Sequence, residues 1–170
     1  SHHTISKSLT YPGRNDVNMA KPRFVDHPLS VEIDRLARSS EHRVLAIWAA
    51  ECAERVLPLF EKERPDDHRP RQAIVRLREW KDSGTFRMDA VRKASLDAHA
   101  AARSLPEGSA AQYAARACGQ AMATAHVKTH SIAAARYAAK AVWAKGGNAN
   151  DIQVEREWQL VLLIGLSDLP

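Results

Sequence analysis

Alanine recurs at helical spacing in the second half of this chain, and this feature constrains the fold more than any other. The densest part lies between residues 90 and 144. In the helix predicted for 109–127, one side carries Ala110, Ala114, Ala117 and Ala121, and another carries Ala111, Ala115, Gly119 and Met122. Such small side chains let neighbouring helices approach the backbone closely, so we predict that this helix lies at the centre of a bundle. Gly119 costs a mid-helix position about 1 kcal/mol relative to alanine, which close packing against another helix offsets.

A helical hydrophobic period continues almost without interruption from residue 30 onward. The predicted helices begin at 30, span about 41–62, 70–83, 87–104, 109–127 and 131–146, and resume from about 150. The expected N-terminal caps are Ser30, Ser109, Ser131 and an Asn150–Gln153 capping box. Pro58 predicts a bend or an early end of the second helix. Because no segment alternates like a strand, we predict an all-α, compact single-domain bundle of six to seven helices over residues 29–170.

Residues 1–28 are expected to form an irregular N-terminal arm, because proline, glycine and scattered charges interrupt any period. Ser1-His2-His3 resembles the remnant of a purification tag, and Met19 is a candidate natural start. The longest apolar run is too short to span a bilayer, and no signal-peptide pattern is present. We therefore expect a cytoplasmic protein that does not contact a membrane.

Basic residues gather between Lys62 and Arg78, in a chain of net charge +5. Nucleic-acid binding through the Arg64–Arg78 stretch is therefore one alternative function. Acidic residues are interleaved throughout, and neither a helix-turn-helix signature nor an aromatic ladder accompanies them. A salt-bridged surface is the favoured interpretation, which leaves nucleic acid disfavoured as a partner. Arg69 and Arg71, beside a predicted helix start, are placed to grip a carboxylate bidentately.

His126 and His130 suggest a second alternative, a metal-dependent enzyme or metal-binding module. On one continuous helix the two imidazoles would lie one turn apart, the spacing that helical zinc sites use. The pattern lacks the glutamate of the H-E-x-x-H motif, and Val127 and Thr129 indicate that the helix ends between the histidines. A third ligand could come only through tertiary contact, so we assign no metal and no cofactor.

No catalytic constellation is recognisable in the sequence. Cys52 and Cys118 lie within alanine-rich helical patterns and are expected to be small buried hydrophobes rather than a disulfide or a nucleophile. The glycines are scattered and form no phosphate-binding loop. Glu51 and Glu54 are better explained by a solvated helix edge than by paired acid–base catalysis. We assign no catalytic residue, and a non-enzymatic protein is favoured over an enzyme.

Several stretches nevertheless match a known pattern. They are Trp48-Ala-Ala-Glu-Cys-Ala-Glu-Arg-Val-Leu-Pro-Leu-Phe60, Asp67-His-Arg-Pro-Arg-Gln-Ala-Ile74, His99-Ala-Ala-Ala-Arg103, the alanine-rich segment 114–142 with Thr124-Ala-His-Val127 and Tyr137-Ala-Ala-Lys140, and the tail Glu155-Arg-Glu-Trp-Gln159. Together they cover about residues 41–160. They resemble the Imm-5-like family of small helical bacterial immunity proteins.

The resemblance implies a cytosolic, non-enzymatic immunity protein that binds and neutralises a cognate toxin deployed against rival bacteria. The basic net charge argues mildly against a nuclease toxin, whose cleft favours an acidic inhibitor. The candidate binding residues are polar positions inside the matched stretches: Asp67, Arg69, Arg71, His99, His126 and His130. We interpret them as a buried polar network or binding pocket, with a structural role favoured. The toxin's identity and the oligomeric state are left open.

Overall fold

The computed structural model describes residues 22–85 and 87–168 of the chain. These residues contain seven α-helices and no strand, which confirms the predicted all-α bundle. The helices are α1 (Leu29–Ser39), α2 (His42–Glu63), α3 (Arg69–Ser83), α4 (Met88–Arg103), α5 (Ala110–Ala123), α6 (His130–Ala144) and α7 (Ala149–Ser167). None of the helices in the described part is long and apolar enough to span a membrane.

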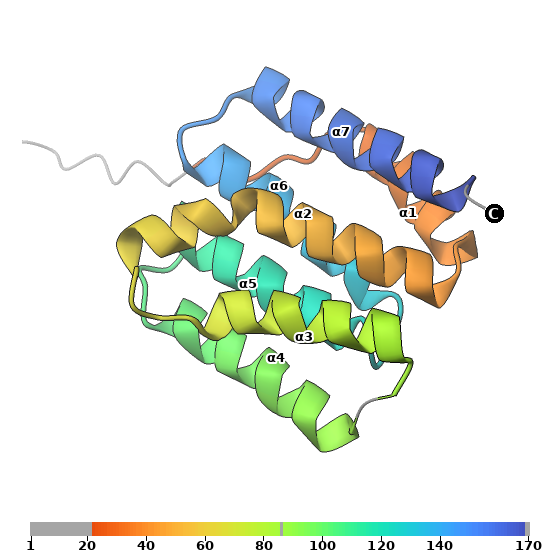
Figure 1. Cartoon of the computed structure of the whole chain (residues 1–170). Coiled ribbons are helices and arrows are strands. Elements are labelled where there is room, and N and C mark those ends of the chain that lie inside the picture. The colour runs from red at the N-terminus through yellow and green to blue at the C-terminus, as the bar shows by residue number, and fades with distance from the viewer. Residues whose placement is uncertain (1–21, 86, 169–170) are drawn as a thin grey trace, which may run out of the picture.

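Helices α2 and α5 share the centre of the bundle (Figure 1). Helix α5 packs against α2, α3, α4 and α6, and α2 packs against α3, α5, α6 and α7. The small side chains of α5 lie close to bulky ones of α2, where Trp48, Leu57 and Phe60 are fully buried. The alanine-rich helix is therefore central as predicted, and it shares that position with the helix that supplies the largest core residues.

The remaining helices form two edges on either side of this centre. Helix α4 lies at the lower edge in Figure 1, next to α3 and α5, whereas α7 lies at the upper edge with α1. Helix α7 packs against α1, α2 and α6. The two edges therefore present different helices, α4 and α7, to the surroundings of the molecule.

Two predicted N-terminal caps, at Ser131 and Asn150, are wrong because other residues nearby take the capping position. Ser131 does not cap α6: it lies buried in the first turn, and its hydroxyl donates to the Lys128 carbonyl at 2.7 Å. The capping box of α7 is Asn148 with Asp151, joined by two reciprocal bonds of 3.0 Å, rather than Asn150 with Gln153.

Other terminal predictions have mixed outcomes. Ser109 caps α5 as predicted, accepting a bond from the Gln112 amide at 3.2 Å. Ser30 is not a cap, because α1 already begins at Leu29 after Pro28. Pro58 lies inside α2, which continues to Glu63; of the two predicted outcomes, the early end is therefore wrong and the bend stays a prediction. Its missing amide leaves one carbonyl of the previous turn without its helical partner.

The N-terminal arm is described from Pro22 to Pro28, and it contacts the bundle through Phe24 and Asp26. Phe24 meets the Trp143 ring edge-on, with centroids 5.8 Å apart, and the Arg136 and Lys140 side chains lie over its ring. Asp26 pairs with Arg156 of α7. The suggested tag remnant at Ser1-His2-His3 and the candidate start at Met19 lie outside the described residues. The described part of the arm is thus held by the ring contacts of Phe24 and by one ion pair.

Candidate functional site

Asp67, Arg69 and Arg71 lie at the start of α3, as the sequence predicted, and their charges are used within the protein. Asp67 accepts two bonds from the Arg69 guanidinium, at 2.9 and 2.7 Å, and one from its backbone amide at 3.2 Å. Arg71 grips Glu61 bidentately, with both bonds at 2.7 Å, which ties α3 to the end of α2. The bidentate grip therefore exists, but it holds a carboxylate of the same chain.

Contacts within the chain also engage Arg64 and Arg78 of the basic stretch between Lys62 and Arg78. Arg78 bonds to both Glu51 and Glu54, which were interpreted as a solvated edge of α2. The Arg78 guanidinium beside Glu54 lowers the pKa of that carboxyl. Arg64 donates to the Ser104 carbonyl at 3.1 Å instead of pointing freely outward. This geometry matches the salt-bridged surface that we favoured over a phosphate-binding face.

His99 lies in α4, where its ring occupies the space that a side chain at Gly119 would need. A Cβ built at Gly119 would lie 2.7 Å from His99 Nε2, so the glycine is required by close approach of α4 to α5. Ser95 strengthens this contact by donating to the Gly119 carbonyl at 2.9 Å. The packing that offsets the helical cost of Gly119 is therefore supplied by α4, through an imidazole.

The protonation state of His99 follows from its neighbours. Its Nδ1 lies 2.9 Å from Arg116 Nη1, and because a guanidinium only donates, Nδ1 accepts and the imidazole is neutral. Burial first, and then the charges of Arg116, Arg103 and His130, lower the pKa of His99 to about 4. His99 is thus a neutral hydrogen-bond acceptor at neutral pH.

His126 and His130 do not share a helix, because α5 ends at Ala123 and α6 begins at His130. His126 is exposed, whereas His130 is half-buried and its Nδ1 lies 2.8 Å from Gln120 Oε1. Within residues 22–85 and 87–168, no group of three histidine, cysteine or carboxylate side chains is arranged to hold a metal ion. The geometry on which the metal-binding alternative depended is therefore not present in the described part.

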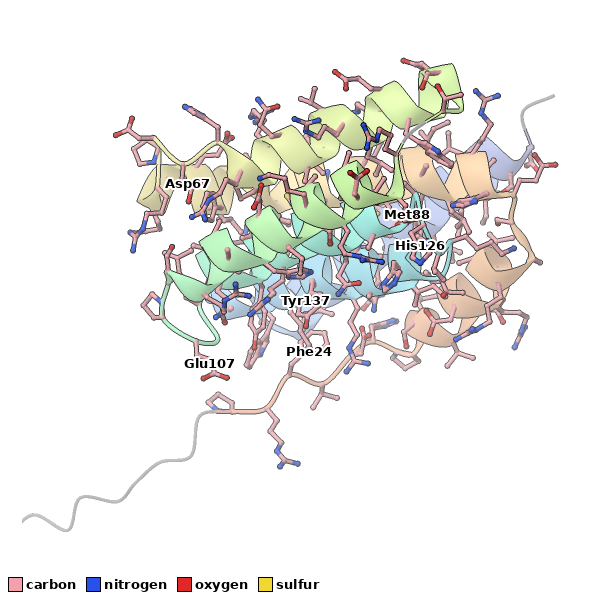
Figure 2. All side chains as sticks on the ribbon, turned by 90° about the horizontal axis from the view of Figure 1, so that it is seen from below. Phe24, Asp67, Met88, Glu107, His126 and Tyr137 are labelled. Carbon is pink, nitrogen blue, oxygen red and sulfur yellow. The ribbon has the colours of Figure 1, made fainter. Side chains whose placement is uncertain are left out.

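The six candidate residues fall into two groups in the structure. Figure 2 shows Asp67 at one end of the layer formed by α3, α4 and α5, and His126 near the other end. Asp67, Arg69 and Arg71 surround the start of α3. His99, His126 and His130 lie on α4 and around the α5–α6 turn, close enough that His130 influences His99 and His126 influences His130. The structure does not bring the two groups into one pocket.

Both cysteines are free and buried, as predicted. Burial raises the pKa of the Cys52 thiol and of the Cys118 thiol well above their usual range. A thiolate, rather than a thiol, is the reactive nucleophile, so neither side chain is prepared for covalent catalysis.

Sequence reasoning missed the most deeply buried polar group, which we call the tail network: Asp26, Trp48, Arg156 and Gln159. Arg156 is 1% exposed and binds Asp26 bidentately, at 3.0 and 2.5 Å, while its third bond reaches Gln159 Oε1 at 2.9 Å. Gln159 donates to the Ala135 carbonyl, and the indole of Trp48 donates to the Gln159 carbonyl, both at 2.9 Å. The available signal was the run of polar residues Glu155, Arg156, Glu157 and Gln159 just before the apolar segment 160–164.

An aromatic group surrounds Lys140 where the arm meets α5 and α6. Its ammonium lies 5.4–5.8 Å from the ring centroids of Phe24, Tyr113 and Tyr137. Figure 2 shows Phe24 beneath Tyr137 on this face of the bundle. Burial lowers the pKa of Lys140. Since the rings attract the cation, this cluster holds the described part of the arm against the bundle.

The comparisons with known proteins identify a family. A family model described as Imm-5 like putative immunity protein matches residues 35–165, which includes the end of α1 and nearly all of α7. No curated protein and no solved structure matches the chain.

Proposed function

Because the chain belongs to the Imm-5 like putative immunity protein family, we propose that it binds a cognate protein toxin in the cytoplasm and neutralises it without catalysing a reaction. The observation that carries this proposal is the extent of the match, which covers residues 35–165 and therefore nearly the whole packed core of the bundle. An immunity protein acts by occupying a surface of its toxin, so its function depends on a stable scaffold and an exposed contact face.

The chemistry of the described residues supports a binding role over an enzymatic one. Asp67, Arg69 and Arg71 are engaged in ion pairs within the chain. His99 accepts a bond from Arg116, and Cys52 and Cys118 are buried thiols whose pKa burial raises. No buried side-chain nitrogen or oxygen in the described part is left without a hydrogen-bond partner. Polar groups prepared for catalysis are commonly strained or incompletely paired, and this core satisfies its own.

Affinity capture from the source organism tests the proposal. The purified chain serves as bait for lysate and secretome, the beads are washed at high salt, and retained proteins are identified by mass spectrometry. An unrelated helical protein of similar isoelectric point is the control for non-specific attraction to a basic bait. We expect one toxin, retained at near-equal stoichiometry by this chain alone. If the toxin is demonstrably present in the sample and nothing is retained, the proposal is wrong.

A further inference from the structure

Helix α7 carries apolar residues on the side that faces away from the bundle. Val154, Val161 and Ile164 are 51%, 69% and 45% exposed, although they are large hydrophobic side chains. Their spacing of seven and three residues places them on one side of the helix. The opposite side is buried by α1, α2 and α6, through residues that include Ile152 and Leu163. From Leu160 to Leu166 the helix is therefore apolar on nearly all sides, while only one side is covered.

We define the outer α7 face by its residues: Val154, Glu157, Trp158, Val161, Ile164 and Gly165. Figure 1 shows α7 at the edge of the bundle, with no helix beyond it. A Cβ added at Gly165 would meet nothing within 4 Å, so the described residues leave this part of the face open. The Arg55 guanidinium lies 4.3 Å above the Trp158 ring and forms one border of the face. A helix with this composition is typical of one that is covered on all sides, which points to a partner.

The charges that α7 itself places beside this face are acidic, in contrast to the net charge of +5 of the whole chain. Asp151, Glu157 and Asp168 are all exposed along α7 or at its end. Among the described residues none of these three carboxylates is in an ion pair: Asp151 caps the helix, and Glu157 accepts a bond from Gln153 at 2.9 Å. Two cations also lie near Val154 and Trp158: the Arg55 guanidinium, which is paired with Glu155, and Lys145, which lines the same hollow as Asp151 and Val154. The outer α7 face is thus an apolar strip whose border carries three carboxylates outside any ion pair, with two basic side chains near Val154 and Trp158.

This charge pattern discriminates between possible occupants. In a symmetric dimer the face would meet its own copy, so the acidic borders of the two copies would lie against each other. A partner with lysine or arginine around an apolar protrusion would instead match both the strip and its border. The net positive charge of the whole chain does not oppose such a partner, because the carboxylates beside the contact act at shorter range than the basic residues elsewhere on the surface.

We propose that the outer α7 face is the surface on which the toxin docks, through an apolar protrusion of the toxin flanked by basic side chains. This inference rests on the proposed function. Val161, the most exposed of the three apolar residues, lies between Val154 and Ile164 and is expected to be buried at the centre of the contact. The basic side chains of the toxin pair with Glu157 and its acidic neighbours at the edge.

Parallel capture with three baits tests this docking surface: the wild-type chain, Val161→Arg and Leu96→Arg. Leu96 is the matched control because it is a large apolar residue, 56% exposed, on α4 at the opposite edge of the bundle. Circular dichroism and unfolding midpoints first establish that all three baits are equally folded. We expect the wild type and Leu96→Arg to retain the same toxin, whereas Val161→Arg binds it about tenfold more weakly or worse.

The outcomes separate the two proposals. If all three baits retain the toxin with equal affinity, the docking surface is wrong and the proposed function stands. If the wild-type chain retains no toxin that is present, the proposed function is wrong and this inference falls with it. A Glu157→Lys bait tests the charge argument: its affinity should be lower at low salt and depend less on salt than that of the wild type. An unchanged salt dependence would overturn the assignment of a basic partner.

A photo-cross-linking residue at position 161 identifies the occupant of the face directly. With p-benzoyl-phenylalanine in place of Val161 in the full chain, illumination in the presence of the captured toxin should link the two proteins. Links to a second copy, or to residues 1–21 of the same chain, formed to the exclusion of the toxin, would overturn the proposal in favour of those occupants.

Discussion

Replacing Asp26 with alanine tests how the N-terminal arm is attached to the bundle. The carboxylate lies 130 residues before Arg156 in the chain and accepts two of the bonds that this guanidinium makes. The side chain of Arg156 is 2% exposed and that of Asp26 17% exposed, so the substitution leaves a buried cation with only Gln159 as a bonded side chain. Removing one partner of a buried ion pair costs about 3–5 kcal/mol of stability. Because Asp26 is partly exposed, we expect Asp26→Ala to lower the free energy of unfolding by about 3 kcal/mol.

Denaturant unfolding of wild type and Asp26→Ala measures this loss, because it gives the free energy of unfolding of each. In a domain of this size about 3 kcal/mol corresponds to a fall in Tm of about 6–12 °C. The matched control is the double variant Asp26→Ala with Arg156→Met, which removes both charges and retains an unbranched apolar side chain. It should lose less stability than the two single variants added together. A loss below about 1 kcal/mol for Asp26→Ala would refute a docked arm with a desolvated ion pair.

Three further predictions concern individual residues of the core and of α7. Burial gives His99 a pKa of about 4, below the unfolded value of about 6.5, so the unfolded chain binds a proton first as the pH falls. The free energy of unfolding should therefore fall by about 2–3 kcal/mol from pH 7 to pH 4, and His99→Gln should flatten this dependence on pH. Gly119→Ala should lower the free energy of unfolding by about 1 kcal/mol, because the new methyl group clashes with the His99 imidazole. Gly165→Ala has open space around it and should raise the free energy of unfolding by about 0.5–1 kcal/mol. Equal effects of the two substitutions would contradict the close approach of α4 to α5. A thiol reagent should label Cys52 and Cys118 only as fast as the protein unfolds, and fast labelling without denaturant would show that they are accessible.

The sequence predicted the helices well because alanine, leucine and valine recur at the helical period over long segments. The errors lie at helix ends, where two polar residues compete for one role. Asn148 and Asn150 are both followed three residues later by a side chain able to complete a capping box, and local sequence does not distinguish them. Ser131 lies one residue inside α6, where its hydroxyl bonds to the Lys128 carbonyl instead of capping.

The polar side chains were harder to interpret, because their partners are determined by tertiary contacts. Arg69 and Asp67 are near neighbours in sequence, yet the pairing of Arg71 with Glu61 depends on how α3 packs against α2. The bond between Asp26 and Arg156 joins the arm to the last helix, and no periodicity reports such a contact. The close approach at Gly119 was predictable as a need for small size, but the imidazole that fills the space was not.

Titration of the captured toxin with the purified chain, while toxin activity is measured, tests whether this chain neutralises a toxin by binding it. We expect toxin activity to fall linearly and to reach zero near one equivalent of the chain, with no turnover. Toxin recovered from the complex by denaturation and refolding should regain full activity and have an unchanged mass. Val161→Arg should need a clear excess to reach the same inhibition, and Leu96→Arg should match the wild type. Inhibition by a catalytic amount of the chain, or a covalent change in the toxin, would contradict the non-enzymatic mechanism. Undiminished toxin activity at an excess of the chain would contradict the immunity function itself.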